Sequence, residues 1–123
     1  MKLHLDAARG RNAFTGYGAG YVTVNGARYE RSLVVLPERL IADWPPTAFE
    51  TLAASHLAAL TGLGVELVLL GTGASLRFPD PEIIRPLIDA RIGLEIMDVQ
   101  AACRTYNILM AEERKVAAAL LLG

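Results

Sequence analysis

The sequence predicts a single α/β domain over residues 1–123, with three layers and a mixed central β-sheet. Two observations carry this prediction. Short apolar runs typical of buried strands alternate with helical stretches, which is the βαβ pattern of a parallel sheet. A β-hairpin signal at Asn25-Gly26 precedes that pattern, and a hairpin attached to parallel strands makes the sheet mixed. No repeat, low-complexity tract or linker divides the chain.

The hairpin is expected over residues 20–29. Asn25 and Gly26 both tolerate a positive φ angle, which a two-residue hairpin turn requires, and β-forming residues flank them. Residues 32–36 are then expected to form a buried strand that Pro37 stops. The chain therefore begins with β-structure near the front of the parallel core.

The first helix is expected to start after the break at Trp44-Pro45-Pro46. Thr47 can cap it, and Glu50 three residues later completes a capping box. An apolar stripe at helical spacing follows, and Gly62 or Gly64 ends the helix. The stripe consists of Phe49, Leu52, Ala53, His56, Leu57 and Leu60.

The parallel core continues with a strand over residues 65–70 and another over residues 94–97. Between them, Asp80-Pro81 is typical of a helix start, and the helix runs towards Arg91. Pro86 lies inside this stretch, which predicts either a kink or a later start near residue 85. The tail over residues 99–121 is rich in Ala and Leu without Gly or Pro, so propensity alone predicts one long helix there.

A distinctive string runs through Gly93-Leu94-Glu95-Ile96-Met97-Asp98, residues 101–109, Ala111-Glu112 and Arg114. It resembles the signature of a family of small uncharacterised α/β proteins. This family includes the mitochondrial respiratory complex I assembly factor 3 and an adipogenesis-associated relative. The resemblance implies a three-layer domain with a mixed central sheet, a helix to about Met110 and an antiparallel last strand over residues 114–121. It implies no established enzymatic activity, and in mitochondria it implies assembly work on a membrane-bound complex.

Composition excludes several classes of function. Lys and Arg number 12 against 13 Asp and Glu, which leaves no basic footprint for nucleic acid. The only cations near the hairpin are scattered, namely Arg9, Arg11, Arg28 and Arg31. The longest uncharged apolar run, residues 116–122, is far too short to insert across a membrane, and the early charges do not fit a signal peptide. A lone Cys103 excludes an internal disulfide and indicates a reducing, cytoplasmic location.

The candidate binding cleft lies where the carboxyl ends of the two parallel strands meet, since ligands of open α/β sheets gather there. The predicted cleft residues come from the turn after the first strand and from the start and middle of the last helix: Gly71, Thr72, Gly73, Asp98, Arg104, Thr105 and Asn107. A dinucleotide fingerprint would need a glycine where Leu76 stands, so a tight turn is favoured over a phosphate loop.

The side chains that could do chemistry each have a structural explanation. Asp98 is expected to cap the last helix, and Asn107 to bond either a backbone group of residues 12–17 or a ligand. Cys103 is expected to be buried and inert rather than a nucleophile, because a cysteine hydrolase also needs a positioned histidine. Only His4 and His56 are present, which gives no short-range metal pairing. We therefore assign no catalytic residue, no metal and no cofactor.

The apolar composition, 53% of residues with a mean hydropathy of +0.34, leaves more apolar surface than one small core hides. Together with the family resemblance, which implies the assembly role, and the lack of catalytic groups, this excess predicts a non-enzymatic accessory protein. It would be an interaction or assembly module with an unidentified protein partner or a second copy of itself. The loop aromatics Phe14, Tyr17 and Trp44 are either lids on the core or, exposed together, an anchor for that partner. The alternative is a small-molecule or nucleotide-binding protein, enzymes included, that uses the Gly71–Asp98 cleft.

Overall fold

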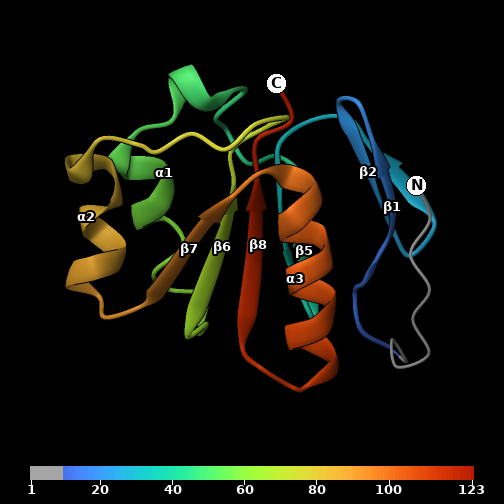
Figure 1. Ribbon diagram of the computed structural model, residues 1–123. Coiled ribbons are helices and arrows are strands. Elements are labelled where there is room, and N and C mark those ends of the chain that lie inside the picture. Colours follow the sequence, from blue (N-terminus) through green and yellow to red (C-terminus); the bar gives the residue numbers. More distant parts are fainter. Residues whose placement is uncertain (1–9) are drawn as a thin grey trace.

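The computed structural model describes residues 10–123, which form two β-sheets and three α-helices (Figure 1). Short turns connect the strands of the smaller sheet, whereas helical crossovers connect the parallel strands of the larger one. The smaller sheet is antiparallel, has the order β1-β2-β3, and consists of β1 (Phe14–Gly18), β2 (Tyr21–Val24) and β3 (Ala27–Tyr29). The larger sheet has the order β5-β4-β8-β6-β7 and consists of β4 (Leu33–Leu36), β5 (Arg39–Ile41), β6 (Leu67–Gly71), β7 (Gly93–Met97) and β8 (Val116–Leu120).

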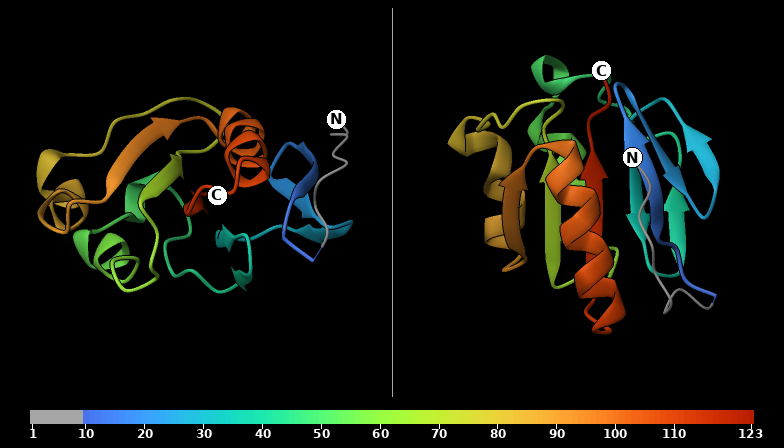
Figure 2. Two further views of the ribbon diagram at one scale, coloured as in Figure 1. Left: turned by 90° about the horizontal axis from the view of Figure 1, so that it is seen from below. Right: turned by 45° about the vertical axis from the view of Figure 1, so that its right-hand side comes forward.

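The helices cover the two faces of the larger sheet. On one face lies α3 (Val99–Ala111), between this sheet and the smaller one, as the two views of Figure 2 show. On the other face lie α1 (Ala54–Ala58) and α2 (Pro81–Asp89). Each face has its own hydrophobic core, and strand residues alternate between the two. Among residues 10–123, no helix is long and apolar enough to cross a bilayer.

The α/β class, the mixed sheet and the βαβ core are as expected, but two details of the sheets differ. The turn at Asn25 and Gly26 is present, with φ angles of 50° and 85°. However, β2 and β3 belong to the separate small sheet and do not extend the central one. The last strand is antiparallel only to β4. On its other side it runs parallel to β6, because α3 returns the chain to the end of the sheet where β7 began.

The C-terminal tail is a helix followed by a strand, as the family resemblance implies and propensity does not. α3 ends at Ala111, and Glu113 reverses the chain with a φ angle of 63°. All five residues of β8 are buried, with Ala118 facing one core and Ala117 and Ala119 facing the other. A central strand that is covered on both faces needs apolar residues throughout, so burial overrides the helical propensity of alanine.

The prediction for the first helix is wrong in both its length and its capping residue. Residues 49–60 form a 3-10 turn, η1 (Phe49–Thr51), and then the short α1, because the backbone at Leu52 and Ala53 is extended. Thr47 does not cap the helix. Its own N–H donates to Oγ1 of Thr51, at 3.1 Å. By contrast, α2 begins at Pro81 as expected. It continues through Pro86, so the alternative prediction of a start near residue 85 is wrong.

Candidate functional surfaces

The predicted cleft does bring the Gly71–Gly73 turn against the start of α3. The N–H of Thr72 donates to the carbonyl of Met97 at 2.9 Å, and the N–H of Val99 donates to the carbonyl of Gly73 at 2.9 Å. Asp98 caps α3, since its Oδ1 accepts from the N–H of Ala101 at 2.8 Å. The carboxyl ends of β6 and β7 therefore meet as expected, and Asp98 has the structural role that was predicted for it.

The turn uses most of its polar groups internally. The hydroxyl of Thr72 donates to the carbonyl of Ser75 at 2.7 Å and accepts from the N–H of Arg77 at 3.0 Å. Thr72 itself is only 3% exposed. These contacts are those of a tight turn that starts a loop, and they leave the Thr72 hydroxyl aimed at its own backbone rather than at a bound phosphate.

A cavity of about 440 Å³ lies at this edge and contains part of the predicted set. Of the seven predicted residues, Gly73 and Asp98 line it, whereas Gly71 and Thr72 do not. The other lining residues come from the hairpin turn, the start of α3 and the end of the chain: Gly18, Ala19, Gly20, Ala74, Val99, Gln100, Leu121, Leu122 and Gly123. The side chain of Gln100 and the carboxylate of Asp98 are the polar side chains of this lining.

The three predicted residues of α3 lie further along the helix, away from this cavity. Asn107 is buried and bonds both backbone groups of Phe14: its Oδ1 accepts from the N–H at 2.9 Å, and its Nδ2 donates to the carbonyl at 2.8 Å. The predicted bond to residues 12–17 is thus present. Arg104 is exposed and donates from Nη1 to the hydroxyl of Tyr17 at 2.9 Å, while Thr105 is half-buried.

The candidate nucleophile is buried and has no histidine beside it among the residues that the structure describes. Desolvation raises the pKa of the Cys103 thiol to about 12, against a smaller opposing effect of Arg104. His56 caps α1, because its Nδ1 accepts from the N–H of Ala53 at 2.9 Å. His4 lies outside the described residues. Within residues 10–123, no group of three or more His, Cys, Asp or Glu side chains could hold a metal ion.

The aromatic residues that were expected in loops are part of the cores. Phe14, Tyr17 and Trp44 are 0%, 3% and 5% exposed, and Phe14 packs edge-to-face on Tyr106 with the ring centroids 5.2 Å apart. They act as lids on the core, and the idea that they form an exposed anchor is wrong. Phe14 and Tyr17 in fact lie in β1.

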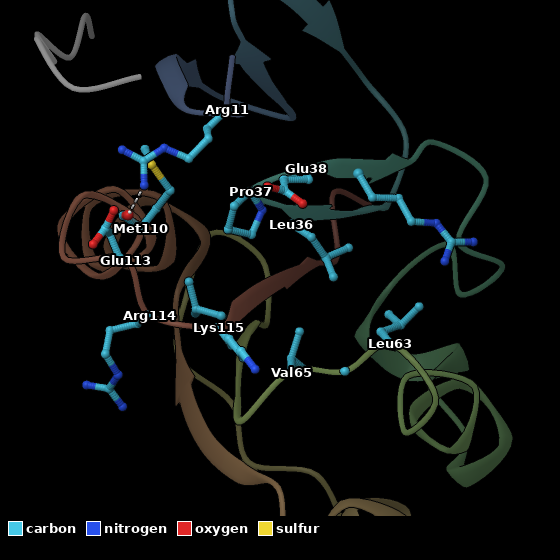
Figure 3. A pocket seen from close by; sticks show the side chains of 13 residues that line it. Arg11, Leu36, Pro37, Glu38, Leu63, Val65, Met110, Glu113, Arg114 and Lys115 are labelled. Carbon is cyan, nitrogen blue, oxygen red and sulfur yellow. Dashed lines mark hydrogen bonds between the residues drawn. The ribbon is translucent and has the colours of Figure 1, made fainter. Parts of the chain in front are cut away.

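Another cavity, of about 670 Å³, lies at the opposite, amino end of β6 and β8, where sequence analysis predicted nothing (Figure 3). We call it the amino-edge groove. Its lining comes from four separate stretches of the chain: Arg11, Leu36, Pro37, Glu38, Arg39, Leu63, Gly64, Val65, Met110, Glu113, Arg114, Lys115 and Val116. Residues so distant in sequence offer no motif. The charged run before β8, residues 112–115, is the one available signal, and by itself it is most simply a solvated turn.

Charges of both signs surround the apolar part of this groove. Arg11 donates from Nη1 to the carbonyl of Met110 at 3.0 Å, and Arg114 donates from Nε to Oε1 of Glu66 at 2.8 Å. The side chain of Lys115 lies beside Val65 in Figure 3. Neither Lys115 nor Arg39 belongs to any of the ion pairs formed within residues 10–123. The groove can therefore offer two cations and an apolar surface to an anionic ligand.

A third surface is the loop 74–79 between β6 and α2, which exposes two large apolar side chains. Leu76 is 49% exposed and Phe78 is 71% exposed. Between them, Arg77 donates from Nη1 to Oε2 of Glu50 at 2.6 Å, and its guanidinium carbon lies 4.2 Å from the ring centroid of Phe49. Together with the backbone bond to Thr72, these contacts fix the loop while its apolar side chains face solvent.

Comparison with known proteins agrees with the family resemblance. Residues 14–121 match the model of a family described as protein of unknown function (DUF498/DUF598). The chain belongs to this family. The DUF498/DUF598 match spans the turn at Gly71–Gly73, the loop 74–79 and all of α3, and it includes most of the amino-edge groove.

Relatives of this DUF498/DUF598 protein differ in how they are named. An uncharacterized protein of Rhodobacter capsulatus is 38% identical over 106 residues, which are 86% of this chain and 81% of that protein. NADH dehydrogenase [ubiquinone] 1 alpha subcomplex assembly factor 3 of Xenopus tropicalis is 26% identical over 122 residues, which are 98% of this chain and 66% of that protein. A crystal structure from Bordetella parapertussis superposes with a TM-score of 0.86 at 44% identity and covers 92% of this chain and 97% of that one.

Proposed function

We propose that this protein is a non-catalytic accessory factor that binds a partner protein through the loop 74–79 during assembly of a multisubunit, membrane-associated complex. One observation carries the proposal: Phe78 and Leu76 are exposed on a loop that Arg77 holds in place. Exposed large apolar side chains favour association with another protein. A loop that is already ordered loses little conformational entropy when it binds.

The assembly role is supported by the relatives. The Xenopus tropicalis protein is named as an assembly factor of NADH dehydrogenase, and this chain spans about two thirds of its length. A cytoplasmic location, drawn from the lone cysteine, belongs to the same proposal, and cell fractionation tests it.

The charges around the loop define the partner surface. Asp80 and Glu82 are exposed at the start of α2, directly after Phe78, and neither belongs to an ion pair within residues 10–123. Glu50 is already paired with Arg77. The complementary surface on the partner is therefore an apolar pocket for Phe78 with Lys or Arg side chains at its rim.

Complementation tests this function directly. Cells that lack the protein receive the wild type, the double variant L76S/F78S, or the control I88S, and assembled NADH dehydrogenase is measured on native gels. Ile88 is 57% exposed on α2, so the control removes a similar apolar side chain elsewhere. We expect the wild type and I88S to restore the complex and L76S/F78S to leave it depleted. Equal restoration by all three would refute the role of the loop.

A second candidate function is the binding of a small molecule, favoured by the two cavities. The amino-edge groove offers Arg39 and Lys115 to a carboxylate or phosphate. The cavity at the carboxyl ends of β6 and β7 offers Asp98 and Gln100. A ligand at 100 times its dissociation constant stabilises the folded state by about 2.7 kcal/mol, which a thermal-shift screen of nucleotides and organic acids detects. If K115Q no longer responds to a ligand that stabilises the wild type, that ligand binds in the amino-edge groove. If K115Q still responds, the ligand binds in the other cavity. A screen without hits would remove this candidate.

A further inference from the structure

The outer face of α3 has an exposed ridge with an isoleucine at its centre. Ile108 is 60% exposed and lies in the last turn of α3, the longest helix. Arg104 and Glu112, one turn before and one turn after it, are exposed as well. Side chains four residues apart form a continuous ridge on a helix. Tyr17 of β1 contacts Arg104 at one end of this ridge, and α3 faces the viewer in Figure 1.

We propose that two copies of the chain associate through this ridge, with the two α3 helices antiparallel and related by a twofold axis at Ile108. A twofold axis at that residue places Ile108 against Ile108 of the second copy. It also places the residue four positions earlier on one helix beside the residue four positions later on the other. Arg104 therefore meets Glu112 of the second copy, and the same pair forms again on the other side of the axis.

Small side chains flank part of the ridge. Ala101 and Thr105 lie along one side, followed by the half-buried Leu109, and Ala111 lies along the other side. Small residues beside Ile108 leave room for the second helix to approach closely at the axis. The second copy supplies the same small residues.

The charges along the ridge are arranged for this pairing. The bond from Nη1 of Arg104 to the hydroxyl of Tyr17 holds the guanidinium at the edge of the ridge. A guanidinium has five N–H donors, so several stay available for a carboxylate. Glu112 belongs to none of the ion pairs within the described part of the chain. Opposite charges at matched positions favour a second copy over an unrelated partner, because the same sequence supplies both halves of each pair.

The oligomeric state in solution tests the apolar contact. Sedimentation equilibrium over a concentration series is measured for the wild type, for I108D and for the control I88D, with circular dichroism to verify folding. Ile88 and Ile108 are almost equally exposed, at 57% and 60%, so the control matches the substitution in chemistry and in exposure. We expect the wild type and I88D to form dimers and I108D to stay monomeric. A wild type that stays monomeric throughout, or I108D that dimerises as the wild type does, overturns the proposal.

Charge reversal tests the orientation of the helices. R104E and E112R each place like charges together and weaken dimerisation, whereas R104E/E112R restores opposite pairs and recovers it. Y17F removes the bond that holds Arg104 but keeps the charge, so it separates loss of that bond from loss of the ion pair, and we expect it to dimerise. No recovery in a double variant that folds would overturn the antiparallel register.

Discussion

Asn107 shows at the scale of one residue how the small sheet is joined to the rest of the molecule. Its side-chain amide bonds the N–H and the carbonyl of Phe14, two groups that would otherwise be unpaired on the edge of β1. Asparagine is a poor residue for the middle of a helix, and these two hydrogen bonds offset its cost there. The sequence signal for this contact was the position of Asn107, a polar residue with low helix propensity inside a largely apolar helical segment.

Replacing Asn107 by alanine tests that role. N107A leaves both backbone groups of Phe14 buried without a partner, and each unsatisfied group costs about 1–3 kcal/mol. We expect the free energy of unfolding to fall by roughly 2–6 kcal/mol on that basis. Urea denaturation followed by circular dichroism measures the change, with Q100A at an exposed site of the same helix as the control. A loss in N107A no larger than in Q100A would contradict the role.

The buried thiol predicts a dependence of stability on pH. Burial raises the pKa of Cys103 from 9.0 to about 12, and burial also raises the pKa of Tyr106. The folded protein therefore keeps these protons at a pH where the unfolded chain releases them. Their contribution to stability is complete below about pH 9 and is lost as the pH rises towards 12.

Comparison with C103A isolates the part that belongs to the thiol. Urea denaturation of both proteins at increasing pH gives the difference in unfolding free energy between them. We expect this difference to move in favour of C103A as the pH passes 9, because alanine has no proton to lose. A difference that stays constant across this range would mean that the thiol ionises equally in both states, and would contradict its burial.

At the scale of elements, local signals were sufficient where a segment is held by local contacts. The turn at Asn25-Gly26, the start of α2 at Pro81 and the strands on either side of α2 follow from the sequence for this reason. The tail differs because β8 is buried on both faces, and this burial selects a strand where alanine alone favours a helix. The first helix differs because the backbone is extended at Leu52, whose side chain packs in the core.

The loop 74–79 is an element whose order depends on one side chain. Replacing Arg77 by methionine keeps the length of the side chain but removes its ion pair with Glu50 and its charge over Phe49. We expect faster amide hydrogen exchange in residues 74–79 and little change elsewhere, because these contacts are local. R85M, at an exposed arginine of α2, is the matched control. Unchanged exchange in R77M would show that other contacts order the loop.

At the scale of the whole molecule, the rule that ligands bind at the carboxyl ends of parallel strands located the cavity beside Asp98 and missed the amino-edge groove. The rule follows from the direction of parallel strands, so it brought Gly73 and Asp98 together correctly. It could not place Arg104 or Asn107, because their contacts are with β1, a strand of the other sheet. The amino-edge groove forms only after β4, β6, β8 and α3 have packed, so no single segment predicts it.

We propose a binding module with two separate surfaces. The loop 74–79 is the proposed site for a partner protein, and the ridge of α3 is the proposed site for a second copy. They lie on different elements, so a variant of one leaves the other intact. I108D is therefore expected to lose dimerisation and still bind the partner.

Photo-crosslinking at position 78 tests the central claim most directly. Phe78 is replaced by p-benzoylphenylalanine in cells that express the full chain, and Ile88 is replaced in the same way as a control of similar exposure on α2. The account predicts one discrete protein adduct at position 78 and none at position 88. No adduct at position 78, or the same adducts at both positions, would contradict it.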